Sequence, residues 1–185
     1  MKDIILFGKP GSGKWTQAEC IRDAFKGQIS HLSTGDIFRS LTSRPNAIGD
    51  YVTDRMDAGL LIDDAVTISL FKAYFYTVID SEKAMLLDGY PRTMPQMEAF
   101  LDLCAEKGRQ VIWLNFELDD ETTIARMMSR ARVGEDENVM KTRLQEYYQH
   151  THPLVERFAQ AFPLYTIDAS PSIETVRIKV GGYLS

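Results

Sequence analysis

The residues with the clearest chemistry lie near the start of the chain, where positions 8–14 read GKPGSGK. This matches the G-x-x-x-x-G-K pattern of a phosphate-binding loop, and an apolar run at 4–7 precedes it as a strand should. Glycines let successive backbone N–H groups curl around a phosphate, and the N-terminus of a following helix adds a positive end. The Lys14 ammonium can reach the outer phosphates of a nucleotide. The spacing therefore predicts a phosphate-binding loop.

Charged residues follow two other apolar runs. Arg39 and Arg92 come after separate predicted strands, so their guanidinium groups can converge on one phosphate and bind it through two hydrogen bonds each. Asp88 ends a strand beside the loop, where a carboxylate can hold Mg²⁺ directly or through water. The alternatives are surface ion pairs for the two arginines and a helix or turn cap for Asp88.

A third group of cations lies in the second half of the chain. Arg126 and Arg130 are four residues apart, so they share one face of a predicted helix, and Arg132 and Arg143 follow. These guanidinium groups are candidates for contacts with a second nucleotide and with the phosphoryl group in transfer. The alternative is a set of solvated helix charges.

The elements that must position these residues alternate along the chain. Apolar runs at 4–7, 29–32, 84–87, 111–116 and 164–167 predict five strands, and amphipathic stretches between them predict helices, among them 14–25, 95–107, 136–161 and 172–183. Continuously apolar strands separated by helices favour a parallel sheet covered on both faces, with ligands at the carboxyl ends of the strands. Residues 37–79 read as helical and are too long for a plain crossover, which indicates an inserted cap; Asp63 is expected to begin its last helix.

Composition narrows the class of protein. The 185 residues include 44% hydrophobic and 25% charged side chains, as in one globular domain, and the net charge of −5 argues against nucleic-acid or membrane-surface partners. No apolar stretch of roughly 20 residues is present, so we expect a cytoplasmic protein without a membrane span. Cys20 and Cys104 lack the spacing of a zinc site and are expected to be reduced, packed thiols.

Four blocks of this sequence together resemble the adenylate kinase family, almost from end to end. Its phosphate loop, G-x-P-G-S-G-K-G-T-Q, is similar to positions 8–17, and its monophosphate-site block is similar to HLSTGDIFR at 31–39. Its D-G-[FY]-P-R-T-x-x-Q signature matches positions 88–96, and its arginine-bearing lid resembles positions 126–143. The resemblance is to the short-lid type, whose members are mostly monomers.

The resemblance implies a three-layer α/β fold with a five-stranded parallel sheet, in a single domain. Its core would span 1–32, 60–125 and 136–185, with a helical monophosphate-binding insert at 33–59 and a very short lid at 126–135. It implies Mg²⁺-dependent, reversible phosphoryl transfer from ATP to AMP, giving two ADP, without structural zinc. The family's ATP site maps onto Pro10, Gly11, Ser12, Gly13, Lys14, Trp15, Thr16, Arg126, Arg130 and Pro171. Its AMP site maps onto Thr34, Gly35, Arg39, Met56, Leu61, Ile62, Gly89, Arg92, Gln96, Arg132 and Arg143. Its catalytic set maps onto Lys14, Arg92, Arg126, Arg132 and Arg143, and its magnesium contact onto Asp88, through water.

Two features depart from the family. The lid is shorter than in other short-lid members, and Trp15 replaces the glycine that follows the loop lysine. If the indole turns aside, the chain is an active kinase for AMP or for another nucleoside monophosphate. If the ring enters the phosphate site, the chain is a disabled nucleotide-binding protein. Both hypotheses are open at the level of sequence.

Overall fold

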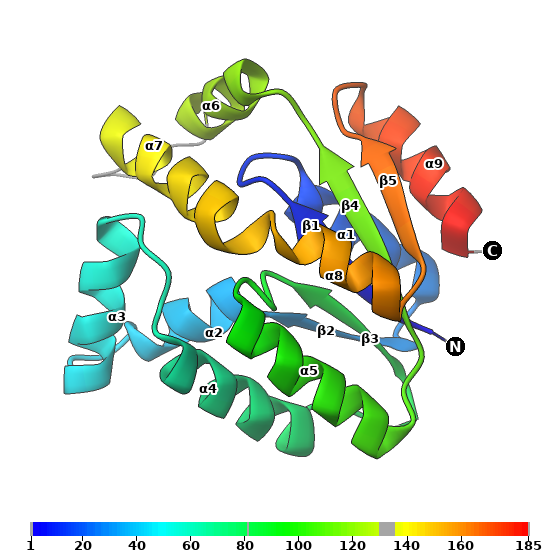
Figure 1. The fold of residues 1–185 in the computed structure, drawn as a ribbon, viewed down its shortest axis with the longest axis horizontal. Coiled ribbons are helices and arrows are strands. Elements are labelled where there is room, and N and C mark those ends of the chain that lie inside the picture. Colours follow the sequence, from blue (N-terminus) through cyan, green and yellow to red (C-terminus); the bar gives the residue numbers. More distant parts are fainter. Residues whose placement is uncertain (1, 81, 130–135, 185) are drawn as a thin grey trace.

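The computed structural model describes residues 2–80, 82–129 and 136–184. Within them, five parallel strands form one sheet in the order β2-β3-β1-β4-β5 (Figure 1). The strands are β1 (Asp3–Gly8), β2 (Ile29–Ser33), β3 (Ala84–Asp88), β4 (Val111–Glu117) and β5 (Leu164–Asp168). The parallel sheet predicted from the apolar runs is confirmed, and each predicted strand lies within an observed one.

Helices pack on both faces of the sheet. One face of the sheet is covered by α1 (Lys14–Phe25) and α9 (Ile173–Leu184), and the other by α4 (Asp64–Thr77), α5 (Met94–Lys107) and α8 (Leu154–Ala161). Successive strand side chains point to opposite faces, so Ile4 packs in one apolar cluster and Ile5 in the other. Because both faces are covered, the three central strands are apolar at nearly every position and read as continuous runs, whereas the edge strands β2 and β5 include partly exposed polar residues such as His31 and Thr166.

Between β2 and β3 the chain forms α2 (Thr34–Leu41), α3 (Ala47–Asp57) and α4. The side chain of Ser33 caps α2 by accepting a hydrogen bond from Asp36 N at 3.3 Å, and Asn46 caps α3 through Gly49 N at 2.8 Å. Asp63 occupies the capping position of α4, but its side chain makes no capping hydrogen bond, contrary to expectation. In Figure 1, α2 and α3 lie beyond the carboxyl ends of β2 and β3.

After β4, the chain continues through α6 (Asp120–Ser129), α7 (Glu137–Glu146), a π-helical turn (Tyr147–Thr151) and α8. The single helix predicted over 136–161 is therefore wrong. Its interruption has a local cause: Pro153 lacks a backbone N–H and its ring displaces the preceding turn, so α8 starts anew at Leu154. The π-helical turn precedes this proline, with His152 N donating to Tyr147 O at 2.7 Å.

Among the helices of the described residues, none is both long enough and apolar enough to cross a membrane.

Candidate active site

The phosphate loop joins β1 to α1 and owes its shape to glycine. Gly8, Gly11 and Gly13 have φ values of 132°, 80° and 87°, in the left-handed region that side chains disfavour. A Cβ atom on Gly8 would also lie 2.3 Å from the carbonyl oxygen of Phe116 on β4. The loop can therefore curl tightly against the neighbouring strand only with glycine at this position.

Lys14 reaches back across this loop. Its Nζ donates hydrogen bonds to the carbonyl oxygens of Gly8 and Lys9, at 2.7 and 2.6 Å. Burial lowers the pKa of Lys14 to about 8; the Arg92 charge lowers it as well, against the opposing attraction of Asp88. The ammonium is thus costly to keep charged in this place, and an anion bound beside it would relieve that cost.

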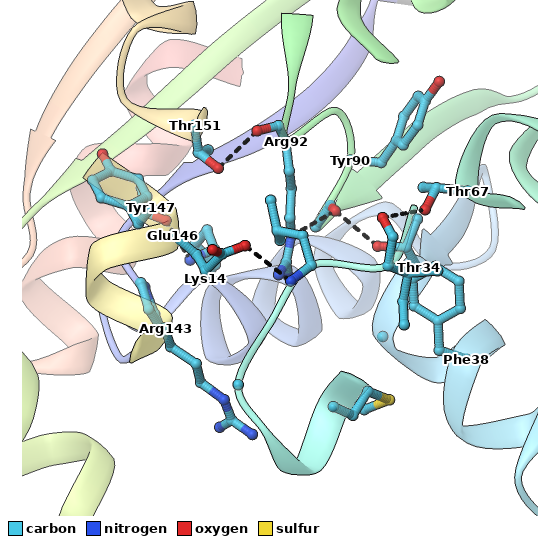
Figure 2. A pocket seen from close by; sticks show the side chains of 18 of the residues that line it. Lys14, Thr34, Phe38, Thr67, Tyr90, Arg92, Arg143, Glu146, Tyr147 and Thr151 are labelled. Carbon is cyan, nitrogen blue, oxygen red and sulfur yellow. Dashed lines mark hydrogen bonds between the residues drawn. The ribbon is translucent and has the colours of Figure 1, made fainter. Parts of the chain in front are cut away.

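A cavity of about 390 Å³ opens in front of the loop, at the carboxyl ends of the strands. It brings together most of the residues predicted for the two nucleotides: Pro10, Gly11, Lys14, Thr34, Gly35, Arg39, Met56, Leu61, Ile62, Gly89, Arg92, Gln96, Arg126 and Arg143. Figure 2 shows a largely basic end, where Lys14, Arg92 and Arg143 lie with one acidic residue, Glu146. The other end is neutral and holds Thr34, Phe38, Thr67 and Tyr90. This separation of charge suits a molecule with a phosphate at one end and a neutral ring at the other.

Arg92 stands at the centre of the basic end. Its Nε donates to Gly89 O at 2.9 Å, and its own carbonyl oxygen accepts a hydrogen bond from the Thr151 hydroxyl at 2.9 Å (Figure 2). The residue lines the cavity although its side chain is exposed. Loss of hydration there lowers its pKa, and the charges of Arg143 and Arg39 lower it further, although Asp88 opposes the shift. Several cations therefore act on one small volume.

The turn that carries Arg92 also requires a glycine with a positive φ. Gly89 has a φ of 83°, and a Cβ atom there would lie 2.7 Å from the Thr34 hydroxyl oxygen. That hydroxyl instead donates to Gly89 O at 2.8 Å. Thr34, Gly89 and Arg92 are thus fastened to one another across β2 and β3.

Gln96 lies deep in the wall and is only 2% exposed. Its Nε2 donates to Asp64 Oδ1 at 2.8 Å, and its Oε1 accepts from the backbone N–H of Arg92 at 2.8 Å. The amide is therefore held by groups from α4 and from the turn before α5.

Arg126, on α6, also borders the cavity. Its guanidinium donates to Ala169 O at 2.9 Å and to Ser170 O at 3.2 Å, just before Pro171. The predicted residues Ser12, Gly13, Trp15, Thr16 and Pro171 do not line the cavity. Arg130 and Arg132, with most of the predicted lid, lie outside the described residues.

Trp15 points away from the cavity. Its side chain is 45% exposed, and its ring centroid lies 5.6 Å from that of His31, with the ring planes inclined by 46°. His31 is on β2, so the indole rests beside the edge strand of the sheet. In this structure the ring does not occupy the phosphate site.

Asp88 is the residue on which a magnesium site would depend. Its charge acts on Lys14 and Arg92, which places the carboxylate at the basic end. In the phosphate loop, Ser12 Oγ is buried without a hydrogen-bond partner among the described residues. No group of three or more histidine, cysteine or acidic side chains is arranged for a metal among the described residues. One carboxylate fits Mg²⁺, since this ion takes few protein ligands and is held largely by water and nucleotide phosphates.

Several wall residues were missed by sequence reasoning. Glu146, Tyr147 and Thr151 line the cavity at its basic end (Figure 2), and Glu146 accepts a hydrogen bond from Leu61 N at 3.1 Å. The only signal was the spacing of Glu146 from Arg143, three residues along one helix face. Thr67 lines the cavity, and Asp64, which does not, bonds to Gln96 in its wall; they are three residues apart at the start of α4 and carried a similar signal.

The family model described as Adenylate kinase matches residues 6–162. An adenylate kinase of Corynebacterium urealyticum is 34% identical over 174 residues, covering 94% of this chain and 93% of that protein. One from Trichodesmium erythraeum is 35% identical over 182 residues, covering 95% and 94%. One from Synechococcus sp. (strain CC9311) is 35% identical over 187 residues and covers both chains fully. With its parallel sheet, its phosphate loop and its basic cavity, this chain therefore belongs to the adenylate kinase family, the nucleoside-monophosphate kinases that transfer phosphoryl groups between ATP and AMP.

Proposed function

We propose that this chain transfers the terminal phosphoryl group of ATP to AMP, reversibly and with Mg²⁺, giving two ADP. The observation that carries the proposal is the convergence of Lys14, Arg39, Arg92 and Arg143 on one cavity in front of the phosphate loop. Two anionic substrates must approach each other there, and clustered cations offset their repulsion.

On the donor side, backbone N–H groups at Gly11, Ser12 and Gly13 cradle the ATP phosphates, and Lys14 contacts the outer ones. Trp15 and Thr16 add the first N–H groups of α1 to this cradle. Arg126 lies against the adenine of ATP, with Pro171 nearby and Arg130 toward the phosphates. The hydrogen bonds from Arg126 to Ala169 O and Ser170 O support this placement, because they hold the planar guanidinium at the rim of the cavity.

On the acceptor side, the phosphate of AMP binds at the basic end. Arg39, Arg92, Arg132 and Arg143 hold it, and bidentate guanidinium contacts orient one of its oxygens for attack. The adenine lies at the neutral end against Gln96, with Thr34, Gly35, Met56, Leu61, Ile62 and Gly89 around it. The charge division of the cavity supports this orientation.

In the transfer step, an oxygen of the AMP phosphate attacks the terminal phosphorus of ATP. The bond from that phosphorus to the bridging oxygen breaks, and ADP leaves. The attacking oxygen is already ionised, so no general base is needed, and His31, His150 and His152 have no role in the step. Mg²⁺, when bound near Asp88 through water, neutralises charge on the phosphates. Lys14 and the arginines stabilise the charge that develops during transfer. The insert at 33–59 and the lid at 126–135 close over the substrates and exclude water.

The test is ADP formation from ATP, AMP and Mg²⁺ by this chain and by Trp15→Gly in parallel. We expect both to turn over at similar rates, within about threefold, because the indole rests against His31 outside the cavity. Turnover by the glycine variant alone would mean that the tryptophan disables this chain.

Comparing AMP with CMP, UMP and GMP as acceptors then tests the alternative of another nucleoside-monophosphate kinase. Size-exclusion chromatography tests the monomer that the resemblance implies.

A further inference from the structure

We propose that Asp64 is a positioning residue that locks the amide of Gln96 in one orientation and thereby makes the site prefer adenine to hypoxanthine. The inference rests on the proposed function, in which the base of the acceptor nucleotide lies against Gln96. Asp64 itself does not line the cavity, so it acts through Gln96.

Two groups hold the Gln96 amide, and each can act in only one way, either as a hydrogen-bond acceptor or as a donor. Asp64 Oδ1 accepts from Gln96 Nε2 at 2.8 Å, and the backbone N–H of Arg92 donates to Gln96 Oε1 at 2.8 Å. A carboxylate oxygen accepts and a main-chain N–H donates. Rotating the amide by half a turn would set oxygen against oxygen at Asp64 and N–H against N–H at Arg92.

Asp64 is in turn held by a second helix. The hydroxyl of Thr93 donates to Asp64 Oδ1 at 2.6 Å, and the same hydroxyl oxygen accepts a hydrogen bond from Gln96 N at 3.4 Å, capping α5. Asp64 is the first residue of α4, so the contact ties the starts of α4 and α5 together. The carboxylate cannot swing away from Gln96 without losing both partners.

Each polar atom of the Gln96 amide then has capacity for one more hydrogen bond. Nε2 keeps one hydrogen and Oε1 keeps one lone pair, and Gln96 is part of the cavity wall. Adenine offers an amino donor beside a ring-nitrogen acceptor, which complements one donor and one acceptor of a glutamine. Hypoxanthine offers a carbonyl acceptor beside a ring N–H donor, in the reverse order.

Hypoxanthine would therefore need the rotated amide that Asp64 and Arg92 oppose. Gln96 is only 2% exposed, so water cannot relieve a mispaired atom there. Discrimination between the two bases follows from the orientation of one side chain, set by a residue outside the cavity.

The test compares kcat/KM for AMP and for inosine monophosphate, with ATP as donor, in the full chain and in Asp64→Asn. The asparagine can present either an oxygen or an N–H to Gln96, so the contact at this position no longer opposes rotation of the amide, and only the backbone N–H of Arg92 still does. We expect the ratio of AMP to inosine monophosphate activity to fall at least about tenfold, with KM for ATP unchanged. Asp63→Asn is the matched control: it removes the same charge at the adjacent, exposed residue and is expected to keep the original ratio.

An unchanged ratio in folded Asp64→Asn would overturn the proposal. If circular dichroism shows that this variant is unfolded, Asp64→Ser replaces it, because serine suits the start of a helix and its hydroxyl can also donate or accept. The same fall in the ratio is expected, and an unchanged ratio again overturns the proposal. Failure of the unmodified chain to form ADP would instead refute the proposed function, so the two failures are distinguishable.

Discussion

The phosphate loop and the acceptor wall perform related tasks with opposite construction. The loop is one short segment, and its key contacts are local: Lys14 bonds to carbonyl oxygens five and six residues earlier. The acceptor wall draws Arg39 from α2, Arg92 from the turn after β3, Gln96 from α5 and Arg143 from α7. A local loop can be recognised from its spacing, whereas a wall assembled from distant segments exists only after the sheet has formed. Substitutions in the two regions should also have different effects: those in the loop should lower turnover, and those in the wall should weaken AMP binding and base selectivity.

The largest effect is expected at the loop. Lys14→Met removes the ammonium that offsets developing phosphate charge, and kcat should fall about a thousandfold. The same variant should unfold at a higher temperature, because it also removes the cost of burying a charge whose pKa is lowered to about 8. Steady-state ADP formation and thermal unfolding by circular dichroism measure both. Activity close to that of the unmodified chain would show that the loop does not supply the catalytic charge.

At the wall, Arg92→Lys should lower kcat/KM for AMP about a hundredfold while KM for ATP changes little. Lysine keeps the charge but cannot make the planar, two-bond contact of a guanidinium or the bond to Gly89 O. Arg177→Lys, in an exposed ion pair with Glu174 on α9, is the matched control and should leave both constants unchanged. Equal losses toward ATP and AMP would contradict the division between loop and wall.

A smaller effect is expected from pH. Lys14 must be protonated to bind phosphate, and its pKa of about 8 lies below the ordinary 10.5. In the free enzyme, kcat/KM for ATP should therefore decline toward tenfold per pH unit above about pH 8. Between about pH 8 and 10.5 the unfolded chain binds more protons at this residue, so the Lys14 contribution to the free energy of unfolding rises with pH. Lys14→Arg serves as the control, since arginine does not titrate in this range. If kcat/KM for ATP still declines above about pH 8 in this variant, the decline comes from a group other than Lys14.

The smallest effect is expected from Thr34→Ala. The hydroxyl bonds to Gly89 O at 2.8 Å and faces the neutral end of the cavity. Its loss should raise KM for AMP about threefold and reduce the preference for AMP over CMP and UMP by a similar factor. Ser69→Ala, whose hydroxyl bonds only within the exposed side of α4, is the control. A wholly unchanged preference would remove Thr34 from the residues that select the base.

Much of the fold could be predicted, and the exceptions are instructive. The strands are predictable because burial on both faces makes the central ones apolar at nearly every position, and the helix from Lys14 to Phe25 has the predicted bounds. The break between α7 and α8 was signalled by Pro153, but the polar–apolar pattern on either side suggested continuity. Asp63 stands at the right position to cap α4 but makes no capping hydrogen bond. The spacing of residues in the sequence predicts which residue occupies the capping position, but it does not determine the rotamer of that side chain.

The sequence by itself determined the strand–loop–helix unit, the family resemblance and the list of cations, because these depend on residue type and on short spacing. Only the tertiary structure decided where the Trp15 ring rests, which cations share a cavity, and how Asp64 and Arg92 orient Gln96. The physical reason is the distance along the chain between the residues that interact. Backbone conformation and amphipathic pattern are set by neighbours a few residues apart, whereas side-chain orientation and charge clustering depend on partners that folding brings together from distant parts of the chain.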